Sequence, residues 1–182
     1  DDHTTIAELA IERAKRLVEL GHDVVVLVDS LTRLARAYQL SIGGGSRSGS
    51  ADTAWVYPTK KLFGAARNVE GGGSLTMVAT VVTDTGMAMD DVVASEVSGA
   101  ATMELVLSAE AAGARVFPAV NVARSGTRKE ELILGADQAA AVASVRQKVS
   151  GPASVEGIQN LVSQLAGTSS NVEALVALPK GL

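Results

Sequence analysis

The chain has 182 residues, of which 47% are hydrophobic and only 3% aromatic, and its formal net charge at pH 7 is −4. This length fits one domain of ordinary size, and a core built from these residues must consist of Val, Leu, Ile and Ala. The acidic balance argues against a broad nucleic-acid-binding face, which needs clustered Lys and Arg. It still allows a small basic site inside an oligomer.

The chain contains no cysteine, which excludes disulfides, thiolate metal sites and a cysteine nucleophile. Its two histidines, His3 and His22, have no partner motif that would make a metal site. No apolar stretch approaches the roughly 18–20 residues that cross a bilayer, and no signal peptide opens the sequence. We therefore expect a cytoplasmic location and no membrane partner.

The first part of the sequence alternates predicted helices with apolar runs. Residues 4–21 have a helical apolar periodicity, with Thr5 and Glu8 as a capping box and Gly21 as a C-terminal stop. Residues 23–29 form a short, β-branched run that predicts a buried strand ending in an acid. Further predicted elements are a helix over 30–40, a Gly/Ser-rich loop over 41–52, a loop running into a helix over 55–70 and a second buried strand over 74–84.

The later part of the sequence continues this alternation and then becomes helical. We expect a turn-rich loop over 84–91, a short helix or loop over 91–99, a third strand over 102–108, a turn over 109–114 and a fourth strand over 115–122, with Pro118 near its edge. Ala-rich helical segments then begin at residue 129, with Gly151-Pro152 between two of them.

This order of elements favours an α/β fold with a mainly parallel sheet flanked by helices. A helical C-terminal appendage follows it. We expect two regions, residues 1–128 and residues 129–182.

Asp29 directly follows the first apolar run. Open parallel sheets bind ligands at the C-terminal ends of their strands. In phosphate-handling enzymes an Asp at this place holds Mg²⁺, directly or through water. Helix capping is an equally good interpretation, because Asp and Ser both cap helices well. These residues alone leave both interpretations open.

Two loops are weaker candidates. The segment "DTGMAMDD", residues 84–91, would lie at the same sheet edge and reach a ligand or a central pore, but a simple acidic turn is the better interpretation in isolation. The Gly/Ser-rich loop carries Arg47 and would be able to contact nucleic acid. Most loops of this composition, however, are only linkers.

The stretch "RSGTRKEE", residues 124–131, follows the fourth apolar run and holds three basic residues and two acids. Arginine presents a rigid fork of donors that suits phosphate oxygens. A turn beyond a strand can also direct an Arg toward a neighbouring subunit. In isolation a solvated turn is favoured instead, and its local ion pairs contribute only about 0–1 kcal/mol.

A phosphate-cradling loop of the type GxxxxGK[ST] is missing, since no Gly-Lys dipeptide occurs in the sequence. These residues alone could not grip the phosphates of a nucleoside triphosphate.

Taken together, several stretches resemble one family. In this order, "AIERAKRLVE", "VVVLVDSLTRLARAY", "KKLFGAARNVEGGGSLTMVAT", "DTG" and "VFPAVNVARSGTRKEEL" are similar to the second half of the motor domain of the bacterial transcription termination factor Rho family. The resemblance is dense over residues 5–135 and weaker beyond them. The stretches "FGAARNVE" with "GGSLT", and "RSGTRKEEL", are specific to that family.

The resemblance implies a RecA-like, ATP-driven translocase that acts on single-stranded RNA as a homohexamer and dislodges RNA polymerase. ATP would lie between two subunits, together with Mg²⁺. Since the phosphate-cradling half is not in this sequence, we expect the chain alone neither to hydrolyse ATP nor to translocate RNA.

The family's site residues carry over to this sequence one by one. Asp29 would be the Walker B acid that acts on Mg²⁺. Ser30 and Arg33 would lie beside it, with Arg33 near the phosphates and the subunit junction. Phe117 would pack near the adenine. Arg128 would be the arginine finger, reaching the ATP of the adjacent subunit. Arg47 would contact RNA from the loop over 41–52, and RNA in the pore would be gripped by Asp84, Thr85 and Gly86.

The sequence also departs from the family pattern. Ala88 stands where many relatives carry Lys, and Ser98 opens "SGAAT" where relatives often read Lys-Gly-Thr-Gly-Asn. Because phosphate contacts dominate affinity for nucleic acid, we expect a weaker grip on RNA in the pore.

Three alternatives stay open at this point. Another hexameric RecA-like ATPase, of the rotary type, also has an Asp-ended strand and a later Arg. A degenerate assembly or regulatory module would explain the missing basic residues but has no need of Asp29, Arg33 and Arg128. An ordinary globular domain explains the strands but not these three residues in this order.

Overall fold

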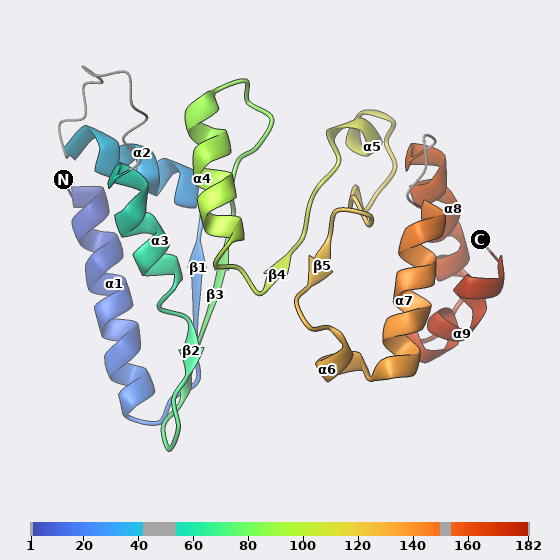
Figure 1. The fold of residues 1–182 in the computed structure, drawn as a ribbon, viewed down its shortest axis with the longest axis horizontal. Helices are drawn as coiled ribbons and strands as arrows, with labels where there is room; N and C mark the ends of the chain where they lie inside the picture. The colour runs from blue at the N-terminus through green and yellow to red at the C-terminus, as the bar shows by residue number, and fades with distance from the viewer. Residues whose placement is uncertain (1, 42–53, 150–153, 182) are drawn as a thin grey trace. The chain divides into compact units, whose positions relative to one another are not determined.

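The computed structural model describes residues 2–41, 54–149 and 154–181. The chain divides into two compact units, Asp1–Ala101 and Thr102–Leu182 (Figure 1).

The first unit contains a small sheet and the helices that pack on it. Its sheet has the strand order β1-β3-β2, with β3 parallel to β1 and antiparallel to β2. The register pairs Val24 with Leu75 and Val28 with Ala79, so the carboxyl ends of β1 and β3 lie at the same edge. The elements are α1 (Asp2–Glu19), β1 (Val24–Val28), α2 (Leu31–Ser41), the 3₁₀-helix η1 (Ala54–Val56), α3 (Tyr57–Phe63), β2 (Arg67–Asn68), β3 (Ser74–Ala79) and α4 (Ala88–Ser98).

The core of this unit is aliphatic, as the composition predicted. It is built mainly from helix residues such as Ile11, Leu34 and Val93, with Leu75 from the sheet. Only one face of β1 is covered in the described structure: Val25 and Leu27 on the other face are 63% and 77% exposed. The prediction of a fully buried strand was therefore wrong for this face, although continuous apolar runs are typical of strands covered on both sides.

At the ends of α1, the predicted stop at Gly21 is confirmed and the predicted capping box of Thr5 and Glu8 is wrong. Gly21 has φ +89° and follows the helix, and its N–H donates to the carbonyl of Val18 at 2.9 Å. It is therefore the predicted stop, because only glycine adopts this conformation without strain. The helix begins at Asp2, which places Thr5 and Glu8 inside it rather than at a capping box. Glu8 instead accepts a hydrogen bond from the Tyr38 hydroxyl at 2.7 Å.

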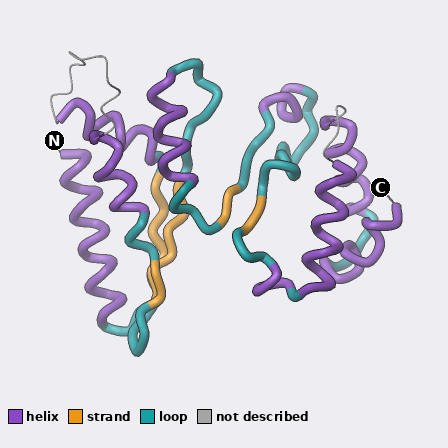
Figure 2. Tube along the Cα trace, in the orientation of Figure 1, coloured by secondary structure: helices purple, strands orange, loops and turns teal. Residues whose placement is uncertain are grey.

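The second unit is mostly helical, with two very short strands (Figure 2). Its core joins Ala111 to residues of the last three helices, among them Val145, Ile158 and Leu178. The predicted helical appendage is thus confirmed. The elements are β4 (Met103–Glu104), α5 (Ala109–Gly113), β5 (Gly126–Thr127), α6 (Glu131–Leu134), α7 (Ala136–Val149), α8 (Ser154–Ala166) and α9 (Asn171–Gly181).

The predicted third and fourth strands differ from what the structure shows. Residues 102–108 contribute only β4, which is antiparallel to β5, and residues 115–122 contribute a single bridge, Val120 to Leu107. Neither joins the sheet of the first unit. Apolar, β-branched runs become strands only where a partner strand supplies hydrogen bonds, and Pro118 has no N–H to donate. The expected turn over 109–114 contains the helix α5.

The division between the units also lies earlier than the expected boundary after residue 128. It falls after Ala101, because the segment that follows packs on the C-terminal helices. Ala111, which is fully buried, belongs to the same core as Val145 and Leu161. Whether 1–128 and 129–182 are functional regions stays a prediction.

Within the described residues, no helix is long and apolar enough to cross a membrane.

Replacing Leu34 by Ala should destabilise the first unit. Leu34 is 2% exposed in the core, and deleting such a side chain costs about 2–5 kcal/mol of unfolding free energy. Leu40→Ala is the control, since Leu40 lies on the same helix but is 84% exposed, and it should change stability by less than about 0.5 kcal/mol. Urea unfolding followed by the fluorescence of Trp55, which packs against this core, measures both variants. Equal losses would contradict the burial described here.

Candidate functional site

The carboxyl edge of the parallel pair β1 and β3 carries an exposed acid. Asp29 directly follows β1, and Thr80 directly follows β3. The Thr80 hydroxyl donates to Asp29 Oδ1 at 2.7 Å, and the Thr80 N–H donates to the carbonyl of Val28 at 3.0 Å. The carboxylate thus lies at the edge where open parallel sheets bind ligands.

Ser30, and not Asp29, caps the helix that follows. The Ser30 hydroxyl accepts a hydrogen bond from the N–H of Arg33 at 3.2 Å, and the Ser30 carbonyl accepts the N–H of Leu34 at 3.1 Å. Such a bond satisfies one of the donors left over in the first turn of a helix. The capping interpretation of this stretch therefore applies to Ser30. The exposed carboxylate of Asp29 contacts the Thr80 hydroxyl instead.

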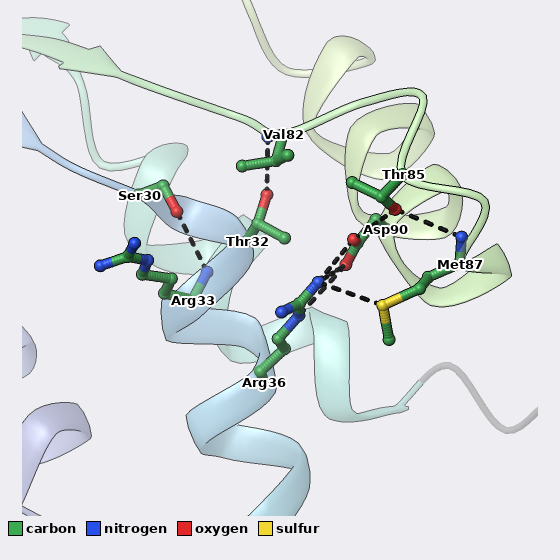
Figure 3. A network of polar contacts seen from close by, with 8 residues as sticks. All are labelled: Ser30, Thr32, Arg33, Arg36, Val82, Thr85, Met87 and Asp90. Atoms are coloured by element: carbon green, nitrogen blue, oxygen red, sulfur yellow. Dashed lines mark hydrogen bonds and ion pairs between the residues drawn. The ribbon is translucent and has the colours of Figure 1, made fainter.

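Two arginines on α2 have different surroundings. Arg33 is exposed, and its side chain extends away from the polar cluster around Asp90 (Figure 3). Arg36, three residues later, forms hydrogen bonds to the carboxylate of Asp90 on α4. Its Nε donates to Oδ1 at 3.2 Å and its Nη2 to the same oxygen at 2.8 Å, with a further bond from Nη2 to Oδ2. This fork fixes orientation as well as distance.

Asp90 is fully buried and is held by two donors. Besides Arg36, the hydroxyl of Thr85 donates to its Oδ2 at 2.7 Å. Hydrogen bonds from Arg36 and then Thr85 hold the pKa of Asp90 below its ordinary value, while burial acts in the opposite direction. The group is therefore a carboxylate at neutral pH, and its ionised form is part of the folded structure.

The loop before α4 is fastened to α2 at two points. Thr32, which is 1% exposed, accepts the N–H of Val82 through its hydroxyl at 2.9 Å, and Arg36 holds Asp90 (Figure 3). Between these points Asp84 has φ +58° and Gly86 φ +75°, which makes a tight exposed turn. The start of α2, next to Asp29, and the turn over 84–86 are thus joined by short polar contacts.

The side chain of Thr85 is committed to this cluster. Its hydroxyl donates to Asp90 and accepts the N–H of Met87 at 3.2 Å. A hydroxyl has one proton to donate, so in this conformation Thr85 has no side-chain donor left for a phosphate. Donors for an anion at this turn must come from its backbone or from other residues.

The structure brings some predicted site residues together. Asp29, Ser30 and Arg33 share the start of α2, and the turn with Asp84, Thr85 and Gly86 is fastened to the same helix. Arg47 lies outside the described residues. Four residues of this site were not predicted from the sequence: Thr32, Arg36, Thr80 and Asp90.

The missed residues left only weak signals in the sequence. Asp90 lay in a loop that looked like a simple acidic turn, and Arg36 only repeated the helical spacing of Arg33. No local pattern pairs these two residues, which are 54 positions apart.

The two remaining predicted residues lie in the second unit. Arg128 directly follows β5 and is exposed, and its N–H donates to the carbonyl of Thr102 at 2.8 Å. Phe117 is 59% exposed. An exposed aromatic ring and an exposed guanidinium can contact a base and a phosphate, respectively.

Among the described residues, no group of three or more His, Asp or Glu side chains could hold a metal ion. Asp29 is a single carboxylate with one hydroxyl beside it. Mg²⁺ in nucleotide sites is bound through one or two carboxylates together with water and substrate phosphates. The residues present at this edge therefore fit a magnesium ion that arrives with a nucleotide, and they do not make a self-sufficient cage.

A comparison with protein families identifies the domain. The model of the ATP synthase alpha/beta family, nucleotide-binding domain, matches residues 2–127. The chain belongs to this family. Membership supports the prediction of a nucleotide ligand, since the matched domain is defined by nucleotide binding.

Curated relatives confirm the resemblance seen in the sequence. The chain is 51% identical over 182 residues to the transcription termination factor Rho of Streptomyces lividans, and 50% identical over 182 residues to that of Micrococcus luteus. It is 46% identical over 182 residues to that of Thermotoga maritima. Each match covers 99% of this chain, but only 26%, 26% and 43% of the respective relative. The chain thus spans between about a quarter and two fifths of these relatives' length.

Solved structures confirm the RecA-like α/β fold class. The assembled ATPase EscN of the enteropathogenic E. coli type III secretion system has a TM-score of 0.64 at 21% identity, over 94% of this chain and 48% of that one. A prototypical ATPase from the type III secretion system of pathogenic bacteria has a TM-score of 0.63 at 20% identity, over 96% of this chain and 58% of that one. At this identity the likeness concerns the fold alone.

The contribution of Asp90 to stability should depend on pH. Its pKa is lowered in the folded state, so its stabilising effect is present above the unfolded value, near pH 4, and is lost as the pH falls through the lower folded value. Asp90→Asn should therefore be less stable than the wild type at about pH 7, and the gap should shrink toward about pH 3. Urea unfolding followed by Trp55 fluorescence over this range measures the gap. A gap that does not change with pH would contradict an ionised, paired Asp90.

Proposed function

We propose that the chain is part of the motor domain of an ATP-driven hexameric translocase that moves along single-stranded RNA and terminates transcription. The observation that carries this proposal is the 42–51% identity to Rho factors over 98–99% of the chain. The exposed Asp29 at the carboxyl edge of β1 and β3 supports it, because an ATPase of this fold needs an acid there. The parent protein works where transcripts are made, in the cytoplasm, with RNA polymerase as its target.

Asp29 acts on Mg²⁺ in this proposal. The bound ion would neutralise the charge that develops on the phosphates of ATP. The Thr80 hydroxyl at 2.7 Å orients the carboxylate, and the cap made by Ser30 fixes the backbone of the turn. Arg33, exposed in the first turn of α2, provides a cation for the phosphates.

Arg128 acts on the ATP of the neighbouring subunit in the homohexamer. Its exposed side chain follows a backbone that is hydrogen-bonded to β4, so the guanidinium is presented from a fixed base. An arginine supplied in trans stabilises the charge of phosphoryl transfer and makes turnover depend on assembly. Phe117, with its exposed ring, packs against the adenine.

The turn over 84–86 contacts RNA. With the Thr85 hydroxyl committed to Asp90, its backbone N–H groups are the donors that phosphate would meet. Arg47, outside the described residues, adds a cation from its loop. Ala88, where many relatives have Lys, leaves fewer phosphate contacts, and affinity for RNA should fall accordingly.

A rotary-type ATPase is the second candidate, since the matching family model is that of the ATP synthase alpha/beta family. The identity to Rho factors, 42–51%, against 20–21% to the secretion ATPases, favours the RNA translocase. A non-hydrolysing module is disfavoured because Asp29, Arg33 and Arg128 are all present and exposed.

ATP hydrolysis by the full-length parent, with and without cytosine-rich single-stranded RNA, tests the proposal. We expect strong stimulation by RNA, and a loss of about a thousand-fold or more in Arg128→Ala, because the transition-state charge loses its partner. Arg124→Ala removes an exposed arginine from the same stretch and is the matched control, with turnover close to wild type.

Two other results of this assay would each favour a different function. Turnover that ignores RNA would point to another RecA-like ATPase, and no turnover in the parent would point to a non-hydrolysing module. The isolated 182-residue chain, which has no phosphate-cradling loop, should show no turnover in the same assay.

A further inference from the structure

The second unit contains an ion pair, between Arg146 and Glu130, whose residues have no part in the site proposed above. Arg146, on α7, donates from Nη1 to Glu130 Oε1 at 2.7 Å and from Nη2 to Oε2 at 2.7 Å. The side chains are 27% and 19% exposed. A two-pronged contact of this kind sets the orientation of both groups, which a single exposed ion pair does not.

The pair lies next to the arginine stretch. Glu130 is two residues beyond Arg128 and directly precedes α6. On the other side of Arg128, the Arg146 guanidinium lies beside Gly126, with Nη2 3.7 Å from the point that a Cβ would occupy there. One guanidinium therefore lies close to the chain before Arg128 and is hydrogen-bonded to the chain after it.

The same stretch has a second attachment. Gly126 and Thr127 form β5, which pairs with β4, and the N–H of Arg128 donates to the carbonyl of Thr102 at 2.8 Å. The backbone of Arg128 is thus held to Thr102, directly before β4, and Arg146 binds Glu130 two residues further on, while the Arg128 side chain is exposed.

Helix α7 gives Arg146 a rigid base. Val145 and Val149, on either side of it in sequence, are 7% and 3% exposed in the core with α8 and α9. The hydrogen bonds from Arg146 hold the pKa of Glu130 below its ordinary value, against the effect of burial. The carboxylate is therefore ionised at neutral pH, and the pair stays formed.

We propose that Arg146 is a positioning residue that, through Glu130 and Gly126, holds the turn from which Arg128 reaches the neighbouring ATP. This rests on the proposed function of Arg128. Misplacing a catalytic group by about 1 Å can cost about a hundred-fold in rate, so a turn that carries such a group needs anchoring on both sides. Lys cannot replace Arg146, because an ammonium does not present the planar fork.

The test uses RNA-stimulated ATP hydrolysis by the full-length parent under single-turnover conditions. Arg146→Gln and Arg146→Lys should each lower the rate constant about 10- to 100-fold, while the apparent affinities for ATP and RNA change less than about two-fold. Arg16→Gln, which breaks the exposed pair with Glu19 on α1, is the control and should leave the rate unchanged.

A double-mutant cycle separates positioning from general damage. If Arg146 acts through Arg128, Arg146→Gln should have no further effect on the rate in an Arg128→Ala background. An equal fold-loss in both backgrounds would overturn the proposal and leave the role of Arg128 standing. If Arg128→Ala itself does not change the rate, the proposed function of Arg128 fails instead.

A second variant, Glu130→Gln, keeps the proposal testable if Arg146→Gln does not fold. Should Arg146→Gln lose its cooperative thermal transition, Glu130→Gln enters the same cycle, since it keeps the size of the side chain and removes its charge and one of its two acceptor oxygens. Loss of rate that depends on Arg128 supports the proposal. A full rate in Glu130→Gln overturns it.

Discussion

The parallel pairing of β1 with β3 is the constraint on which the candidate site depends. Its register ends both strands together, Val28 opposite Ala79, so that Asp29 and Thr80 emerge side by side and share a hydrogen bond. A slip of one residue would turn each side chain of a strand to the other face and separate the acid from its hydroxyl partner. The chemistry assigned to this edge is therefore a consequence of strand register.

Helix α2 connects this edge of the sheet to the loop that follows β3. Its first residues use Ser30 as a cap and Thr32 as an acceptor for the backbone of Val82, and one turn later Arg36 fixes the buried Asp90. These contacts tie the loop over 80–87 to the residue after β1 by rigid elements. They provide a physical link between the sites proposed for nucleotide and RNA.

The sequence predicted what is local and missed what is long-range. The run over 23–29 and the helix after it carry their own periodicity, and Gly21 marks its own stop. The segments 102–108 and 115–122 have equally apolar compositions, but whether such a run becomes a strand depends on a partner that composition does not specify. Likewise Asp90 looked like part of an exposed acidic turn, because its burial depends on Arg36, 54 positions away in the sequence.

Each of the two units has one arginine that binds a carboxylate and another whose side chain is exposed. In the first, Arg36 binds a buried carboxylate and holds a loop, while Arg33 on the same helix is exposed. In the second, Arg146 binds Glu130 and holds a turn, while Arg128 on that turn is exposed. In this chain, whose net charge is −4, carboxylates bind the arginines that build the scaffold. In each unit, one arginine stabilises the structure by binding a carboxylate, and another has an exposed side chain that is proposed to meet a phosphate.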